Sequence, residues 1–236
     1  MWLRCVALPA LSLAFSGVAQ AASLPPIIAT ADNAVPACVT PADLMRFLDD
    51  RNARIHRTID PRLDNIANLY KKIGTCVSRE PEKCVGVRWD YAFFQMLIET
   101  NYLTFRRPNG TPASMSSADN NFAGVGAAIA GKPGEHFNDE RTGVLAHLQH
   151  VLMYSNTRIP QPVARRTRQV QDDVQAVMRR LHRPVTYADL ARQWTGVGKS
   201  SYAEQLRQLA ERYAERFCHG EDLSARAAMA KPAQAR

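Results

Sequence analysis

The most continuous hydrophobic pattern in the chain lies between residues 89 and 105. At about 100° per residue, its apolar side chains surround nearly the whole cylinder of a helix, which is typical of a buried helix: Phe93, Phe94, Met96, Leu97, Ile98, Tyr102 and Leu103. Asp90 is expected to cap the start of this helix. No Pro or Gly follows before Pro108, so we expect about four unbroken turns.

Two polar residues, Gln95 and Glu99, lie one turn apart within this apolar pattern. Burial disfavours the charged form of a carboxylate and raises its pKa. A raised pKa is what a general acid needs at neutral pH. The alternative is a buried Glu that pairs with an Arg, and the helix alone does not choose between the two.

Other stretches show helical periodicity with start and stop signals. Thr40 and Pro41 are typical of a cap and first helical position, and this helix is expected to reach about His56. Further helices are expected from Asp60-Pro61 to near Gly74, at 142–156, at 169–182, from Thr186 to Trp194, and from Ser200 or Ser201 to about Phe217. A glycine-rich stretch near 121–137 suits at most a small β element. The predicted fold class is mainly α, with a small β part.

The first 21 residues have the pattern of a secretory signal peptide. Arg4 precedes a short apolar run at 6–18, and Ala19-Gln20-Ala21 is a cleavage signature. The run is too short to span a bilayer. We therefore expect a periplasmic or secreted protein, cleaved near Ala21, with no transmembrane segment after cleavage. The rest divides into an extended lead-in at 22–40, one domain at 41–219 and a disordered tail at 220–236.

Cysteine usage and charge agree with export. After removal of Cys5 four cysteines remain, and an even count predicts disulfides. Among the three possible pairings we favour Cys76–Cys84 with Cys38–Cys218. The net charge of +8 favours polyanions such as nucleic acid, anionic lipid or cell-wall glycan without choosing among them. Basic residues are grouped in one segment of the chain: Arg158, Arg165, Arg166 and Arg168.

Four motifs in order resemble the glucosaminidase-type peptidoglycan hydrolases, glycoside hydrolase family 73, which include mannosyl-glycoprotein endo-beta-N-acetylglucosaminidase-like domains. They are F-Q-M-L-I-E-T-N-Y-L-T-F at 94–105, N-N-F-A-G-V-G-A at 120–127, G-V-L-A-H-L-Q-H at 143–150, and D-L-A-R-Q-W at 189–194 followed by Tyr202-Ala203. This chain has Asn101 where the family pattern has Gly after E-T. The last loop also differs, with Thr195 after Trp194.

The resemblance implies a lysozyme-like fold and hydrolysis of the β-1,4 bond after N-acetylglucosamine in peptidoglycan. Glu99 is then the general acid. The expected substrate-binding residues are Gln95, Asn120, Asn121, Gln149, Tyr154, Trp194 and Tyr202. For the two Asn the alternative role is turn formation, for Gln149 packing or hydrogen bonding near the acid, and for the aromatic residues a place in the core.

The motifs do not fix the second catalytic carboxylate. Glu135 and Asp119 are the candidates, and catalysis by the sugar's own acetamido group is the alternative. No cofactor is expected. His147 and His150 form an H-x-x-H pair without an apparent third ligand, so we do not predict a metal. The expected partner is the peptidoglycan strand, with no nucleic acid, and we expect a monomer. Two alternatives stay open: a lytic transglycosylase, and a non-catalytic peptidoglycan-binding module.

Overall fold

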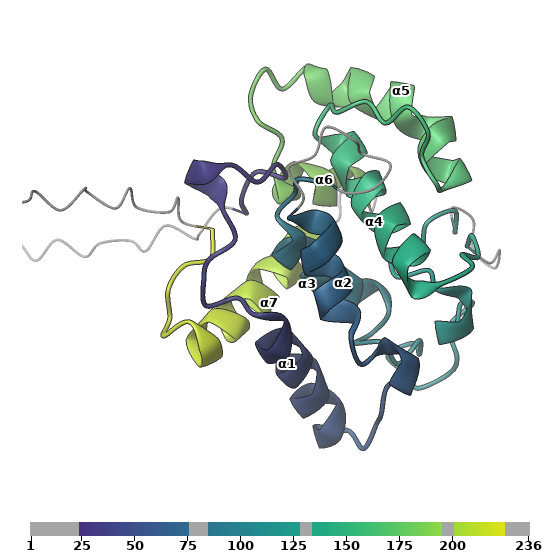
Figure 1. Ribbon diagram of the computed structural model, residues 1–236, viewed down its shortest axis with the longest axis vertical. Coiled ribbons are helices and arrows are strands. Elements are labelled where there is room, and N and C mark those ends of the chain that lie inside the picture. The colour runs from purple at the N-terminus through teal and green to yellow at the C-terminus, as the bar shows by residue number, and fades with distance from the viewer. Residues whose placement is uncertain (1–23, 76–84, 128–133, 195–200, 225–236) are drawn as a thin grey trace, which may run out of the picture.

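The computed structural model describes residues 24–75, 85–127, 134–194 and 201–224 (Figure 1). Within these ranges the helices are α1 (Pro41–Arg54), α2 (Ile66–Gly74), α3 (Trp89–Glu99), α4 (Glu140–Tyr154), α5 (Arg165–Arg179), α6 (Tyr187–Trp194) and α7 (Ser201–Phe217). Short 3-10 helices occupy Ala31–Asn33 (η1), Pro61–Leu63 (η2) and Ser117–Asp119 (η3). None of the described helices combines the length and apolarity needed to cross a membrane. The predicted mainly helical class is confirmed.

The core is built around α3, which Figure 1 shows in the middle of the molecule. Every residue from Trp89 to Leu97 is buried, as predicted for a helix that is apolar all round. Helices α2, α4 and α7 pack against it, α1 contacts both α2 and α7, and α5 lies on α4. The second half of the chain also contains a fully buried stretch, from Gly143 to Tyr154 in α4.

Helices α1 and α4 start at local capping residues. The Thr40 side chain accepts a hydrogen bond from the Asp43 N–H at 3.1 Å, with Pro41 first in α1. Helix α5 is different, because it starts at Arg165 and not at 169 as predicted. Its cap comes from a distant segment: both carboxylate oxygens of Glu135 accept from the first backbone N–H groups of α5.

Helix α3 differs from its prediction at both ends. Arg88 occupies the cap position, and Asp90 lies inside the helix, so the predicted cap is wrong. The helix ends at Glu99 and does not continue to 105, because Asn101, Tyr102 and Leu103 have φ angles of 47°, 59° and 59°. These residues are in the left-handed region, which cannot extend a right-handed helix. Glu99 is therefore the last helical residue.

The predicted β element near 121–137 is not formed by its described residues, 121–127 and 134–137, which adopt turns and extended chain. The β contacts in the described chain are isolated bridges: Pro26 with Thr186, Ile28 with Val87, and Arg106 with Pro112. Residues 128–133 lie outside the described part of the chain.

The two ends of the domain are tied together as predicted. Cys38 and Cys218 form a disulfide with an S–S distance of 2.08 Å. Cys76 and Cys84 lie outside the described residues, so their pairing stays a prediction. The predicted disordered tail is wrong for residues 220–224, because Leu223 is only 2% exposed and its carbonyl accepts a hydrogen bond from Arg88.

Candidate active site around Glu99

The Glu99 side chain lies at the C-terminal end of α3, where it meets the start of α7 and the loop after η3. The Tyr202 hydroxyl donates a hydrogen bond to Glu99 Oε1. On the other side, a β-carbon built on Gly124 would lie 3.6 Å from Glu99 Oε2 and 3.7 Å from the Met115 methyl group. Among the described residues, no arginine, lysine or histidine forms an ion pair with Glu99. The alternative of a buried Glu–Arg pair is therefore not what the structure contains.

Burial raises the pKa of the Glu99 carboxyl to about 7, while hydrogen bonds from Tyr202 and Trp194 act in the opposite direction. A carboxyl with this pKa is substantially protonated at neutral pH. The residue keeps partial solvent exposure. The residue therefore combines a proton held at neutral pH with partial exposure, two features that suit a general acid.

Gln95, predicted as a substrate contact, lies one turn before Glu99 and is completely buried, so the structure gives it internal contacts. Its Oε1 is 3.3 Å from Nε2 of His147, and His147 Nδ1 is 2.7 Å from the Tyr70 hydroxyl. Burial lowers the pKa of His147 to about 3, so the ring is neutral. Because an amide oxygen only accepts, Nε2 carries the ring proton and Tyr70 donates to Nδ1.

The buried polar contacts run from Tyr70 through His147 to Gln95. They end there, because Gln95 Nε2 has no hydrogen-bond partner among the described residues. The contact of the Tyr202 hydroxyl with Glu99 is separate from them.

Trp194 belongs to a group of rings beside Glu99. Its centroid is 5.2 Å from His150, 6.0 Å from Tyr154 and 6.2 Å from His147. Trp194 keeps partial exposure, whereas Tyr154 is only 6% exposed. The structure places Trp194 and Tyr202 beside Glu99 and Tyr154 against Trp194. Tyr202, like Tyr154, is 6% exposed.

The loop that carries Asn120 and Asn121 is organised by these two side chains. Asn121 is completely buried; its amide nitrogen donates to the carbonyls of Val125 and Glu135, at 2.9 and 2.8 Å, and its oxygen accepts from Val125 N–H at 2.9 Å. These contacts are those of the alternative role, turn formation, and the predicted substrate contact has no exposed atom to make it. Asn120 adopts a left-handed conformation, with φ 49°, and donates to the Phe137 carbonyl at 2.8 Å. It is 3% exposed, so it too holds the loop.

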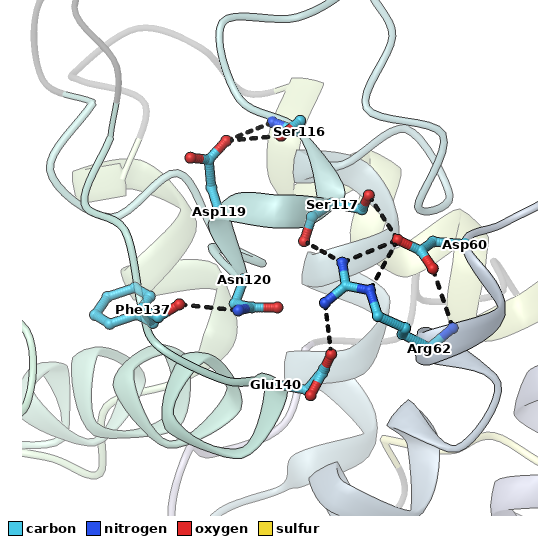
Figure 2. Close-up of polar contacts among 8 residues, drawn as sticks. All are labelled: Asp60, Arg62, Ser116, Ser117, Asp119, Asn120, Phe137 and Glu140. Atoms are coloured by element: carbon cyan, nitrogen blue, oxygen red, sulfur yellow. Dashed lines mark hydrogen bonds and ion pairs between the residues drawn. The ribbon is translucent and has the colours of Figure 1, made fainter.

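Figure 2 shows how η3 is attached to the helices on either side of it. Arg62 bridges Asp60, the Ser117 carbonyl and Glu140 at the start of α4. Asp119 accepts hydrogen bonds from the N–H and hydroxyl of Ser116 at 2.8 and 3.0 Å. These contacts lower the pKa of the Asp119 carboxyl, against the effect of its partial burial.

Both candidates for the second carboxylate already make capping contacts within the protein. Asp119 caps η3, and both oxygens of Glu135 cap α5. Gln149, predicted as a substrate contact with packing or hydrogen bonding near the acid as its alternative, is buried and accepts from Val163 N–H at 2.9 Å.

Gly143 sets the distance between α4 and the Asn120 loop. A β-carbon at Gly143 would lie 1.8 Å from the Asn120 carbonyl oxygen, so the loop or the helix must move in Gly143→Ala. We expect Gly143→Ala to lower the free energy of unfolding by about 2–3 kcal/mol, measured by urea titration. The control is Gly110→Ala, where an added β-carbon meets nothing within 4 Å and only the left-handed backbone penalty of about 1 kcal/mol applies. Equal losses in the two variants would contradict the close approach.

Sequence reasoning missed two kinds of residue at this site. Met115 borders Glu99, and nothing in its sequence context indicates this position. Several arginines line a pocket together with Asn101. Asn101 replaces the glycine of the family pattern, and this replacement was the sequence signal that could have indicated them. In the described parts of the chain, no group of three His, Cys, Asp or Glu side chains is placed to hold a metal ion.

Comparisons with known proteins do not assign a family. No protein-family model matches the chain, and no solved structure matches it. A protein of Borreliella burgdorferi whose function is not characterised is 37% identical over 99 residues, or 42% of this chain. The matched part spans 44% of that relative's length, so the chain corresponds to less than half of it.

Proposed function

We propose that this protein is an exported peptidoglycan hydrolase of the glucosaminidase type, with a lysozyme-like fold and Glu99 as its general acid. The observation on which the proposal rests is the Glu99 carboxyl, with a pKa of about 7, partial exposure and a hydrogen bond from Tyr202. Glu99 comes from the first of the four motifs that resemble glycoside hydrolase family 73, and Trp194 and Tyr202 come from the fourth. Their meeting at one site supports the resemblance.

In the proposed reaction, protonated Glu99 donates its proton to the glycosidic oxygen as the bond to the sugar carbon breaks. The Tyr202 hydroxyl stabilises the carboxylate that remains. Trp194 offers a partly exposed ring suited to the face of a sugar. Because Asp119 and Glu135 serve as helix caps, we favour attack by the sugar's 2-acetamido group, followed by water.

Export is part of the same proposal. The Cys38–Cys218 disulfide is of a kind that persists in oxidising compartments, and residues 1–21 have the signal-peptide pattern. A periplasmic or secreted protein would meet the anionic cell wall there, and its basic charge favours that encounter.

The test is digestion of purified peptidoglycan by the full-length mature protein, with products analysed by mass and by reducing end. Products that carry one added water and end in N-acetylglucosamine support the hydrolase. Anhydro products would identify a lytic transglycosylase instead. Binding to peptidoglycan without any product would favour the non-catalytic binding module and overturn the enzymatic proposal.

A further inference from the structure

A second pocket, separate from the contacts of Glu99, is lined by arginines. It lies between the end of α1 and the loop after α3, with a volume of about 380 Å³. Arg51, Arg57, Arg106 and Arg107 line it, and its lining contains no Asp or Glu. We call these four residues the arginine pocket.

The four guanidinium groups have no carboxylate partner among the described residues. Some arginines elsewhere on the surface do have such a partner. Arg158 pairs with Asp172, and Arg183 and Arg192 pair with Asp189. Four uncompensated positive charges around one hollow favour an anionic ligand.

One member of the arginine pocket is held in place before any ligand arrives. Arg51 donates to Asn52 Oδ1 at 3.1 Å and to Asn101 Oδ1 at 2.8 Å, and its guanidinium lies 4.3 Å from the centre of the Tyr102 ring. The Asn101 amide nitrogen in turn donates to the Arg106 carbonyl at 3.0 Å. Asn101, which replaces the glycine of the family pattern, therefore joins two parts of the pocket and reduces the entropy lost on binding.

The arginine pocket adjoins a larger hollow of about 550 Å³. Arg57, Thr104 and Arg106 line both hollows. Met115 lines the larger one, and a β-carbon built on Gly124 would lie 3.7 Å from its methyl group and 3.6 Å from Glu99 Oε2. A ligand that extends from Glu99 past Gly124 and Met115 would enter the larger hollow, whose lining shares Arg57 and Arg106 with the arginine pocket.

We propose that the arginine pocket binds carboxylates of the peptide stems carried by the glycan strand, and so selects strands that still bear peptides. This proposal rests on the proposed function, because it assumes that the strand occupies the Glu99 site. Guanidinium groups match carboxylates in shape and charge. The peptide stem is the part of peptidoglycan that supplies carboxylates several bonds away from the sugar backbone.

The test compares the wild type with the double variant Arg57→Gln/Arg107→Gln. These two side chains are exposed and make no hydrogen bond with the described residues, so their replacement should leave the fold intact. The control is Arg179→Gln/Arg180→Gln at the end of α5, which removes the same charge from another part of the surface (Figure 1). The probes are purified peptidoglycan, the same material after enzymatic removal of its peptides, and vesicles of anionic phospholipid. Binding is measured by co-sedimentation and cleavage by product release.

We expect the double variant to bind peptide-bearing peptidoglycan about tenfold more weakly, and to match the wild type on peptide-free glycan in both binding and cleavage. The control should match the wild type on both. If the double variant bound both glycans equally more weakly, or lost binding only to the anionic vesicles, the assignment to peptide carboxylates would be overturned. If the wild type cleaves both glycans and the double variant is unaffected on either, the arginine pocket proposal fails while the hydrolase proposal stands. If the wild type cleaves neither, the hydrolase proposal fails and the peptide-selection proposal falls with it.

Discussion

Glu99→Gln is expected to reduce the rate of peptidoglycan cleavage by about 10²- to 10⁴-fold, the usual contribution of a general acid. Gln has the same shape as protonated Glu but cannot give up a proton. Its side-chain oxygen can still accept the hydrogen bond from Tyr202, so the site should keep its geometry. The measurement is the initial rate of release of reducing ends from purified peptidoglycan.

The matched control for this variant is Glu215→Gln on α7, where the side chain is exposed and unrelated to the site. It should retain the wild-type rate. If Glu99→Gln also retained that rate, the acid role would be wrong and the binding module would become the leading interpretation.

The pH dependence gives an independent measurement of the same group. Because the pKa of Glu99 is raised to about 7, the proton needed for catalysis is lost as the pH rises through that value. The wild-type rate should therefore fall above about pH 7.

The same raised pKa affects folding. The folded state binds a proton that the unfolded chain loses near pH 4.5, so the stability contribution of Glu99 falls as the pH rises from there to about 7. Glu99→Gln should unfold at higher urea concentration than the wild type at pH 8, and this difference should shrink below pH 4.5. Removal of a catalytic group commonly stabilises a protein in this way.

The second large effect is expected from Arg88→Met, which should lower the free energy of unfolding by about 3–5 kcal/mol. Arg88 and Asp90 are both completely buried. The guanidinium donates to both Asp90 oxygens, at 2.9 and 2.6 Å, and to the Asn33 side chain at 3.0 Å. Without Arg88, the Asp90 charge is left in the core with no cation, and the measurement is the urea unfolding midpoint and slope.

A double variant separates this mechanism from a simple packing loss. Arg88→Met/Asp90→Asn removes the uncompensated charge, so it should recover part of the stability lost in Arg88→Met. Arg158→Met is the control, because the pair of Arg158 with Asp172 is exposed and such pairs contribute little. A double variant less stable than Arg88→Met would contradict the charge argument.

The helices with local signals were predictable, and those shaped by distant contacts were not. The Thr40-Pro41 cap fixes the start of α1 within the sequence itself. The start of α5 depends on Glu135, thirty residues earlier, which no local pattern indicates. The end of α3 depends on three successive left-handed residues, Asn101 to Leu103, none of them glycine, so the sequence lacked the usual stop signal.

The residues of the candidate site also differ in whether local sequence predicts their surroundings. Burial of Glu99 and its raised pKa were predictable from the apolar pattern around it. The motifs indicated Trp194 and Tyr202 as substrate contacts, which stay predictions, and did not indicate the hydrogen bond from Tyr202 to Glu99. Burial of Gln95 and Asn121 was not predictable, because a motif does not show whether a polar side chain faces a ligand or its own backbone. The internal hydrogen bonds of Asn121, and the contact of Gln95 with His147, form only when the segments are packed together.

The attachment of Leu223 to Arg88 defines where the protein can be shortened. A truncation after α7 at Phe217 would remove both Cys218 and the Leu223 carbonyl, which accepts from Arg88 at 2.7 Å. The cut would therefore remove a hydrogen-bond acceptor of the buried Arg88 guanidinium at the start of α3, more than 100 residues earlier in the chain. Expression truncations and C-terminal tags should keep every residue through 224.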